Sequence, residues 1–190
     1  MSPDVKAVLL LIAVSASVSM CGLVGLAYGE EPAKNTLHQY LLSLPRHTTD
    51  EDETQPEREQ RLLEKAEAIQ SATDNAEERA WLTMTGTRES HWARYVDLDL
   101  DRCKGGHSGR CDRGRAWSVW QLHGTDRTGG AKAAAVKALE TFRRGAKFCR
   151  SRGHDYWEGG TAMYARGDYC AWVEASSRVL QMRKVLGQIR

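Results

Sequence analysis

A single uncharged hydrophobic run near the amino terminus limits what this chain can fold into. Residues 7–29 carry no charged side chain over 23 positions, and no second run of that length follows. About 20 apolar residues are enough for a helix to cross a bilayer, so we expect no polytopic membrane protein. Ala27 and Gly29 also supply the small residues of a signal-peptidase cleavage site. We therefore predict that residues 1–29 are a signal peptide or an uncleaved signal anchor.

The charges beside this run predict which part of the chain is exported. Lys6 precedes the run, and Glu30 and Glu31 follow it, which favours an amino terminus on the cytoplasmic side. Residues 30–190 are then periplasmic or extracellular, and they are anchored to the inner membrane if the segment is uncleaved. Cys21 suggests a lipoprotein as a weaker alternative, because Met20 is too large for the usual lipobox.

Four further cysteines agree with an oxidising compartment. The pairings Cys103–Cys111 and Cys149–Cys170 close the shortest loops, and exported proteins commonly hold such pairs as disulfides. The alternative is a zinc site, since His107 lies midway between Cys103 and Cys111. We favour the disulfides and predict no metal and no cofactor, because no fourth zinc ligand stands nearby.

Charge divides the exported part into two regions. Residues 31–80 carry twelve acidic and six basic side chains, whereas residues 81–190 carry eleven acidic and twenty basic ones. We expect residues 30–56, which mix Pro, Thr and acidic residues, to be a flexible acidic linker, in which the amphipathic segment Leu37–Leu44 forms a turn or two of helix. Residues 57–190 are predicted to be the folded domain, and their positive charge favours an anionic partner.

Apolar residues recur at helical spacing through most of this domain. The predicted helices start near Glu57 and span Asn75–Glu89, Ala131–Cys149, Thr161–Tyr164 and Tyr169–Ile189. The glycine-, arginine- and aspartate-rich stretch 97–115 is predicted to be a disulfide-stapled loop or small hairpin. Gly153 and the pair Gly159–Gly160 are expected to break the helical pattern. The fold class is therefore mainly α, in one domain of about 130 residues.

Glu89 is the leading candidate for chemistry. It ends a predicted amphipathic helix, with Trp81, Met84 and Trp92 within a turn or two. A carboxyl group against apolar surface is expected to have a raised pKa, so it can act as a general acid near neutral pH. The alternative is a solvated glutamate that pairs with an arginine at a helix end.

Three short motifs in order resemble the lysozyme-like lytic transglycosylase family. They are Glu89-Ser90, then Ser118-Val119-Trp120-Gln121, then Ala162–Gly167 after a long alanine-rich helix. Ser118 stands where the family has glycine, and Arg166 stands near the place of an asparagine. The resemblance covers residues 76–178 and implies a lysozyme-like domain.

The resemblance also implies roles for individual residues. Glu89 is similar to the acid/base of the family and Ser90 to its helix-end neighbour. The resemblance implies that Ser90, Gln121, Tyr164 and Trp120 bind substrate. Gln121 matches a glutamine in the cleft, and Tyr164 matches the tyrosine that orients the acid. Aromatic side chains, with Trp120 among them, are expected to stack on sugar rings of the substrate.

These roles predict cleavage of peptidoglycan between MurNAc and GlcNAc with one glutamate and a 1,6-anhydro product. A lysozyme-type hydrolase is the near alternative, and it needs a second carboxylate to place water. The acidic residues available for that role lie in the loop region: Asp97, Asp99, Asp101 and Asp112. A phage endolysin with a releasable signal anchor is one form of this alternative, because Cys21 is then free to exchange disulfides.

A non-catalytic reading stays open beside the enzyme. The domain is then a cell-wall-binding module, or a scaffold in a cell-envelope or virion assembly, since a fold does not fix a function. The expected partner is peptidoglycan, with the membrane as a second partner through residues 1–29. No nucleic-acid partner is expected, although the helix around Arg143 and Arg150 ends in basic residues.

Overall fold

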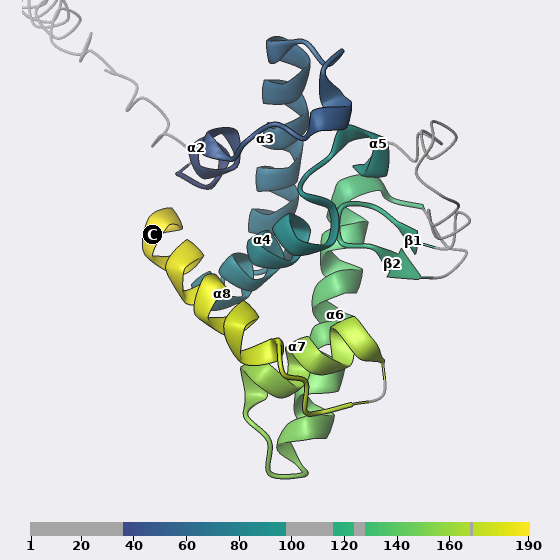
Figure 1. The fold of residues 1–190 in the computed structure, drawn as a ribbon, viewed down its shortest axis with the longest axis vertical. Helices are drawn as coiled ribbons and strands as arrows, with labels where there is room; N and C mark the ends of the chain where they lie inside the picture. Colours follow the sequence, from purple (N-terminus) through teal and green to yellow (C-terminus); the bar gives the residue numbers. More distant parts are fainter. Residues whose placement is uncertain (1–35, 98–115, 124–127, 168) are drawn as a thin grey trace, which may run out of the picture. The chain divides into compact units, whose positions relative to one another are not determined.

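The computed structural model describes residues 36–97, 116–123, 128–167 and 169–190 (Figure 1). Within them the chain is mainly helical, as predicted. The elements in chain order are α2 (Thr36–Ser43), the 3-10 helix η1 (Thr48–Asp50), α3 (Gln55–Ala72), α4 (Ala76–Ser90), α5 (Arg94–Asp97), β1 (Ala116–Trp117), β2 (Leu122–His123), α6 (Gly130–Arg150), α7 (Tyr156–Arg166) and α8 (Ala175–Ile189). No helix among the described residues is long and apolar enough to cross a membrane, and residues 7–29 lie outside that part.

The helices with the clearest periodicity, α3, α4 and α6, lie close to their predicted bounds. The two carboxyl-terminal helices differ from the prediction in where they begin. α7 begins earlier, at Tyr156, because the Asp155 carboxylate accepts hydrogen bonds from the backbone N–H groups of Trp157 and Glu158, at 2.9 Å each. α8 begins later than predicted, at Ala175, and the segment before it carries the disulfide cysteine Cys170.

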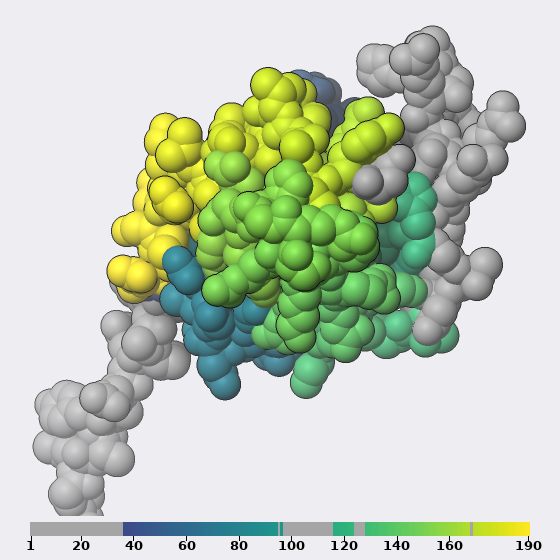
Figure 2. Space-filling view, turned by 90° about the horizontal axis from the view of Figure 1, so that it is seen from below, coloured from purple at the N-terminus to yellow at the C-terminus, as the bar shows by residue number. Residues whose placement is uncertain are grey.

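The core is centred where α6 packs against α3 and α7. The Phe142 ring of α6 is fully buried, and its centroid lies 4.3 Å from that of Trp81 and 5.2 Å from that of Trp157. Aromatic pairs at such separations add to the stabilisation that burial alone provides. Figure 2 shows α7, in yellow-green, beside α8, in yellow.

Gly159 and Gly160 lie inside α7, so the prediction that they break the helical pattern is wrong. A Cβ at Gly160 would lie 2.7 Å from the Cβ of Ala146, and one at Gly159 would lie 2.5 Å from the Cβ of Cys149. Both distances are shorter than carbon–carbon contact allows. The glycines are therefore needed for the close approach of α7 to α6.

α4 is held at its first turn by a cap and an ion pair. The Asn75 side chain accepts hydrogen bonds from the backbone N–H groups of Glu77 and Glu78, which caps the helix. The buried Glu78 carboxylate accepts two hydrogen bonds from Arg143 of α6, at 2.7 and 2.6 Å, and one from Thr73. The ion pair joins the first turn of α4 to α6, at the opposite end of the helix from Glu89.

Residues 36–56 are not the flexible linker that the sequence predicts. Leu37 and Leu41 of α2 are buried in the core, and α2 packs against α3 and α8. Asp50 and Glu53 are also buried, and Glu53 accepts two hydrogen bonds from Arg61 of α3, at 2.7 and 3.0 Å. The acidic composition therefore reflects buried ion pairing as well as solvated charge.

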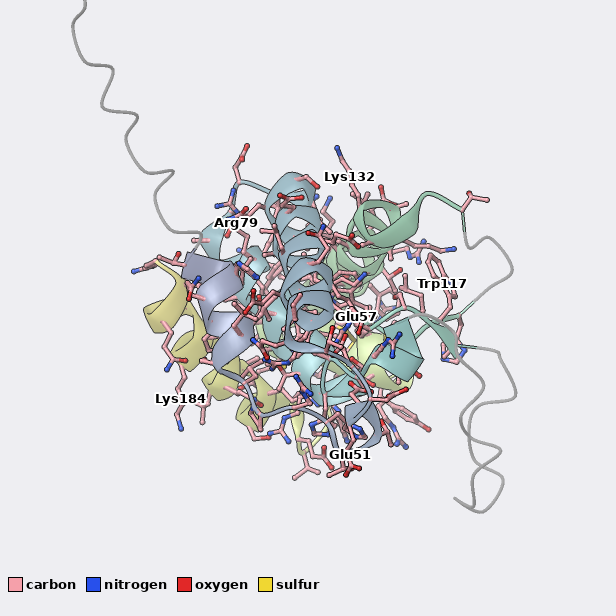
Figure 3. The ribbon with its side chains drawn as sticks, turned by 90° about the horizontal axis from the view of Figure 1, so that it is seen from above. Glu51, Glu57, Arg79, Trp117, Lys132 and Lys184 are labelled. Carbon is pink, nitrogen blue, oxygen red and sulfur yellow. A yellow bond between two sulfur atoms is a disulfide. The ribbon has the colours of Figure 1, made fainter. Side chains whose placement is uncertain are left out.

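The start of α3 also orders this region. The Thr54 hydroxyl accepts a hydrogen bond from the backbone N–H of Glu57, and the Glu57 carboxylate accepts one from the backbone N–H of Thr54. This reciprocal capping box begins the helix, and Figure 3 shows the position of Glu57. The folded unit that includes it starts at Asn35 rather than at residue 57.

A disulfide joins Cys149 at the end of α6 to Cys170, which confirms one predicted pairing. The second predicted pair, Cys103–Cys111, and the alternative zinc site with His107 lie outside the described residues. Among the residues that are described, no group of three or more histidine, cysteine, aspartate or glutamate side chains is placed to hold a metal ion.

Candidate functional site

Glu89 lies in the last turn of α4, where the chain bends sharply. The helix ends because His91 and Trp92 adopt left-handed backbone conformations, with φ of 51° and 56°. Non-glycine residues rarely adopt this region, and such strained positions cluster at functional sites. The Glu89 side chain is 23 % exposed, so it is mostly covered but still reaches solvent.

Arg178 of α8 is the direct partner of Glu89. One of its terminal guanidinium nitrogens donates a hydrogen bond to Glu89 Oε1 at 2.5 Å, and the Arg178 side chain is 14 % exposed. Its guanidinium carbon lies 4.6 Å from the centroid of the Trp172 ring, in the range of a cation–π interaction. The sequence predicts apolar surroundings for Glu89, but an arginine contacts the carboxylate directly. This ion pair agrees with the alternative, a glutamate paired with an arginine at a helix end, because Arg178 lies in the first turn of α8, although Glu89 is mostly covered rather than solvated.

β1 and β2 form a short antiparallel hairpin whose connecting residues are 118–121. Ser118 and Gln121 both have positive φ, of 60° and 52°, and the Gln121 backbone N–H donates to the Ser118 carbonyl at 3.0 Å. Glycine adopts this region without strain, which explains why a glycine suits the position of Ser118. The Gln121 amide nitrogen donates to the same Ser118 carbonyl at 3.3 Å, so this side chain folds back onto its own turn.

Trp120 is fully buried, which corrects the prediction that it contacts substrate. Its indole N–H donates to the Leu82 carbonyl of α4 at 3.0 Å, and its ring meets the Trp92 ring edge to face with centroids 6.2 Å apart. A tryptophan with a satisfied N–H and no exposed surface is a core residue. Its contribution is to fasten the hairpin to α4.

Tyr164 of α7 connects the same hairpin to α7. Its hydroxyl donates to the Trp120 carbonyl at 2.6 Å, and its ring meets the Trp81 ring edge to face at 5.0 Å. Burial raises the pKa of the Tyr164 phenol, and the negative charge of Glu89 raises it further. The Tyr164 hydroxyl therefore keeps its proton and donates it in the hydrogen bond to the Trp120 carbonyl. The phenol and the Glu89 carboxylate are also close enough to interact electrostatically.

Ser90 is buried and holds the end of α4, which corrects the prediction that it binds substrate. Its hydroxyl donates to the Gly86 carbonyl at 2.8 Å and accepts a hydrogen bond from the backbone N–H of Trp92 at 3.1 Å. Both interactions stabilise the sharp bend after Glu89. Ser90 thereby acts on the orientation of its neighbour without facing solvent.

Three segments that are far apart in the sequence are thus linked through α4, which Trp120 contacts at Leu82, two turns before Glu89. The Trp120 indole binds α4, the Tyr164 hydroxyl binds the backbone of Trp120, and Glu89 lies at the end of the same helix. Comparison of the chain with protein-family models, curated proteins and solved structures finds no match. The functional assignment therefore depends on the geometry of these three segments and of Arg178.

A pocket of about 350 Å³ shares Trp172 with the Glu89–Arg178 pair. Its other lining residues include the carboxylates of Asp155 and Glu158, His154 and the exposed Val173. Pockets that combine an aromatic ring with a few polar groups are typical of small-molecule sites, and this volume is in their lower range.

Sequence reasoning missed Arg178 and the role of Trp172. Arg178 occurs among many basic residues of the carboxyl-terminal half, so composition does not distinguish it. Trp172 is predicted within a helix, whereas it lies before α8. The side chains proposed as a second carboxylate, those of Asp97, Asp99, Asp101 and Asp112, lie outside the described part.

Proposed function

We propose that the chain is a peptidoglycan-cleaving lytic transglycosylase with a lysozyme-like domain, and that Glu89 is its general acid/base. One observation carries the proposal: the three motifs that resemble this family meet at one place in the fold. Tyr164 and Trp120 are hydrogen bonded to each other, Trp120 is hydrogen bonded to α4, and α4 ends at Glu89. Motifs matched by chance have no reason to come together in this way.

The proposed reaction needs one carboxyl group that first gives and then takes a proton. Protonated Glu89 donates its proton to the glycosidic oxygen between MurNAc and GlcNAc while the bond from that oxygen to C1 breaks. The ionised Glu89 then accepts the proton of the MurNAc 6-hydroxyl as O6 bonds to C1. The product is a 1,6-anhydro sugar, no water is consumed, and Glu89 ends protonated as it began.

The exposure of Glu89 supports a catalytic role over a purely structural one. The side chain is partly covered yet 23 % exposed, and Glu89 precedes two non-glycine residues with positive φ, His91 and Trp92. A general acid must contact its substrate, which a fully buried group cannot do. A fully exposed glutamate, in turn, would lack the fixed orientation that proton transfer needs.

The proposal includes a place of action. Peptidoglycan lies outside the cytoplasmic membrane, so we propose export through residues 1–29, as a cleaved signal or as an anchor in the inner membrane. The Cys149–Cys170 disulfide agrees with an oxidising compartment. The basic residues of the carboxyl-terminal part provide attraction to an anionic cell-wall mesh, in a bacterium or in a phage.

Digestion of purified peptidoglycan tests this function. The full-length oxidised chain and Glu89→Gln are incubated with peptidoglycan, and the released muropeptides are weighed by mass spectrometry. We expect products one water lighter than hydrolysed muropeptides from the wild type and none from the variant.

Two other outcomes would change the assignment. Hydrated products that disappear with Glu89→Gln would mean a lysozyme-type hydrolase, and the search for a second carboxylate would turn to residues 97–112. A folded, oxidised wild-type chain that releases nothing would contradict the enzyme and favour a cell-wall-binding or scaffold protein.

A further inference from the structure

The ion pair at Glu89 is built differently from the two structural ion pairs of the fold. Arg143 and Arg61 each make two hydrogen bonds to their carboxylates, on Glu78 and Glu53. In each of these bidentate pairs, both carboxylate oxygens and two guanidinium nitrogens form hydrogen bonds. Arg178 makes one hydrogen bond, to Oε1 of Glu89.

This single contact leaves two groups unused. Within the described residues, Oε2 of Glu89 accepts no hydrogen bond, and the buried Nε of Arg178 has no partner. An arrangement selected for stability alone would satisfy these atoms, because an unpaired buried donor is costly. The free oxygen belongs to a side chain that reaches solvent, where a substrate can approach it.

The position of Arg178 is fixed by its contact with the Trp172 ring and by burial. Its guanidinium stacks on the Trp172 ring at 4.6 Å, and Trp172 follows two residues after Cys170, which is bonded to Cys149 of α6. The side chain is also mostly buried. Arg178 is therefore a rigid support rather than a mobile surface arginine.

We propose that Arg178 is the positioning residue of the Glu89 acid/base: it holds Oε1 and leaves Oε2 to carry the proton that reaches the substrate. This inference rests on the proposed function. In the first half of the reaction, Oε1 accepts from Arg178 while the proton on Oε2 moves to the glycosidic oxygen. In the second half, Oε2 takes the proton of the 6-hydroxyl, and Arg178 stabilises the carboxylate that exists between the two transfers.

The single hydrogen bond from Arg178 gives the proposal a signature in the choice of substitution. A lysine at this position keeps a positive charge and a donor for Oε1 of Glu89, whereas a methionine keeps neither.

The test compares Arg178→Met and Arg178→Lys with Arg183→Met, a matched control at an exposed arginine of the same helix. All are made in the full-length oxidised chain and assayed for muropeptide release from pH 4 to 9. We expect Arg178→Met to lower kcat by about 10- to 100-fold with little change in KM, since a misplaced catalytic group loses about that much. Arg178→Lys restores part of the rate, and Arg183→Met matches the wild type.

The outcomes separate the two proposals. If the wild type is active and Glu89→Gln is not, but Arg178→Met leaves kcat unchanged or Arg178→Lys restores none of the lost rate, Arg178 does not position Glu89 and this inference fails alone. If the wild type is inactive, the proposed function fails and the inference falls with it.

A second measurement does not depend on activity, so it also tests the proposal if a variant folds poorly. The urea midpoints of Glu89→Gln, Arg178→Met and the double variant are compared. A coupled pair predicts that the double variant loses less than the sum of the single losses. Strictly additive losses would contradict a contact between the two side chains in solution.

Discussion

Helix α4 joins two regions of the molecule that are built in different ways. In its first turn, the buried Glu78 accepts two hydrogen bonds from Arg143 of α6, and Phe142, which precedes Arg143, packs among aromatic rings. Its last turn carries Glu89, which has one hydrogen bond to an arginine whose Nε is unpaired among the described residues. The ion pair at the first end is bidentate, whereas a donor and an acceptor stay unpaired at the second.

The backbone shows the same division. Among the described residues, every non-glycine position with positive φ lies in one of two segments, residues 91–92 or residues 118–121. Both segments adjoin the end of α4 that carries Glu89. Strain of this kind persists only where the surrounding structure imposes it, and it is common at functional sites. The comparison teaches that substitutions in the core should alter stability and that those near Glu89 should alter activity.

The largest effect on stability is expected from Phe142→Ala. This ring is fully buried among three aromatic neighbours, so its removal should lower the free energy of unfolding by about 3–5 kcal/mol. Phe148→Ala, on the same helix but with a ring that is 43 % exposed, should cost less than about 1 kcal/mol. Urea unfolding measures both, and equal losses would show that the core is not centred on Phe142.

A smaller loss is expected from Gly160→Ala. The new methyl group would overlap Phe142 and Ala146, so α7 must move away from α6 at a cost of about 1–3 kcal/mol. Gly187→Ala in α8 is the control, because no atom lies within 4 Å of its Cβ position and alanine favours a helix. The control should be slightly more stable than the wild type. Destabilisation by both substitutions would contradict the close-packing explanation.

The loss of stability in Glu78→Gln should depend on pH, and this dependence tests the ion pair at the first turn of α4. Burial raises the pKa of Glu78, but the hydrogen bonds from Arg143 and Thr73 outweigh burial, so the net pKa lies below the ordinary value of 4.5. The ionised form therefore stabilises the fold above that ordinary value, and this stabilisation is lost as pH falls through the lowered pKa.

We expect Glu78→Gln to lose about 1–2 kcal/mol at pH 7, since Arg143 is partly solvated, and to approach the wild type in acid. Urea unfolding at pH 7 and pH 3 tests this, with the exposed Glu77→Gln as the control. A loss that is the same at both pH values would mean that the charge of Glu78 is not what stabilises α4.

The smallest effect is expected at the hairpin beside Glu89. Ser118 has a φ of 60°, so Ser118→Gly should relieve backbone strain and raise stability by about 0.5–1 kcal/mol. Ser118→Ala keeps the strain and loses the hydrogen bond from the Trp120 backbone N–H, so it should be less stable than the wild type. Thermal unfolding compares the three proteins. A glycine variant that is less stable than the alanine variant would rule out strain at this turn.

Local patterns in the sequence predict the long helices and one disulfide. The periodic apolar residues of α3 and α6 suffice because each of these helices buries one face along its length, whereas α4 is buried on all sides from residue 80 to residue 86. The resemblance implies that Tyr164 orients Glu89, and in the structure the Tyr164 hydroxyl donates to the Trp120 carbonyl instead.

Contacts between distant residues limit what the sequence can predict. Asp50 and Glu53 resemble linker residues until Arg61 is brought beside them, and the glycines of α7 resemble a helix break until α6 is known to lie against them. Arg178 is one basic residue among many until the fold places it on Glu89. In each case the deciding partner is far away in the sequence, so local pattern carries no signal for it.

The central claim is that Glu89 serves catalysis rather than stability, and one paired measurement tests it most directly. The rate of muropeptide release and the urea midpoint are measured together for the wild type, Glu89→Gln and the exposed control Glu174→Gln. We predict that Glu89→Gln loses at least about 100-fold in rate, as expected for a general acid, while it stays folded with a midpoint close to that of the wild type. A Glu89→Gln variant that releases muropeptides as fast as Glu174→Gln would contradict the account.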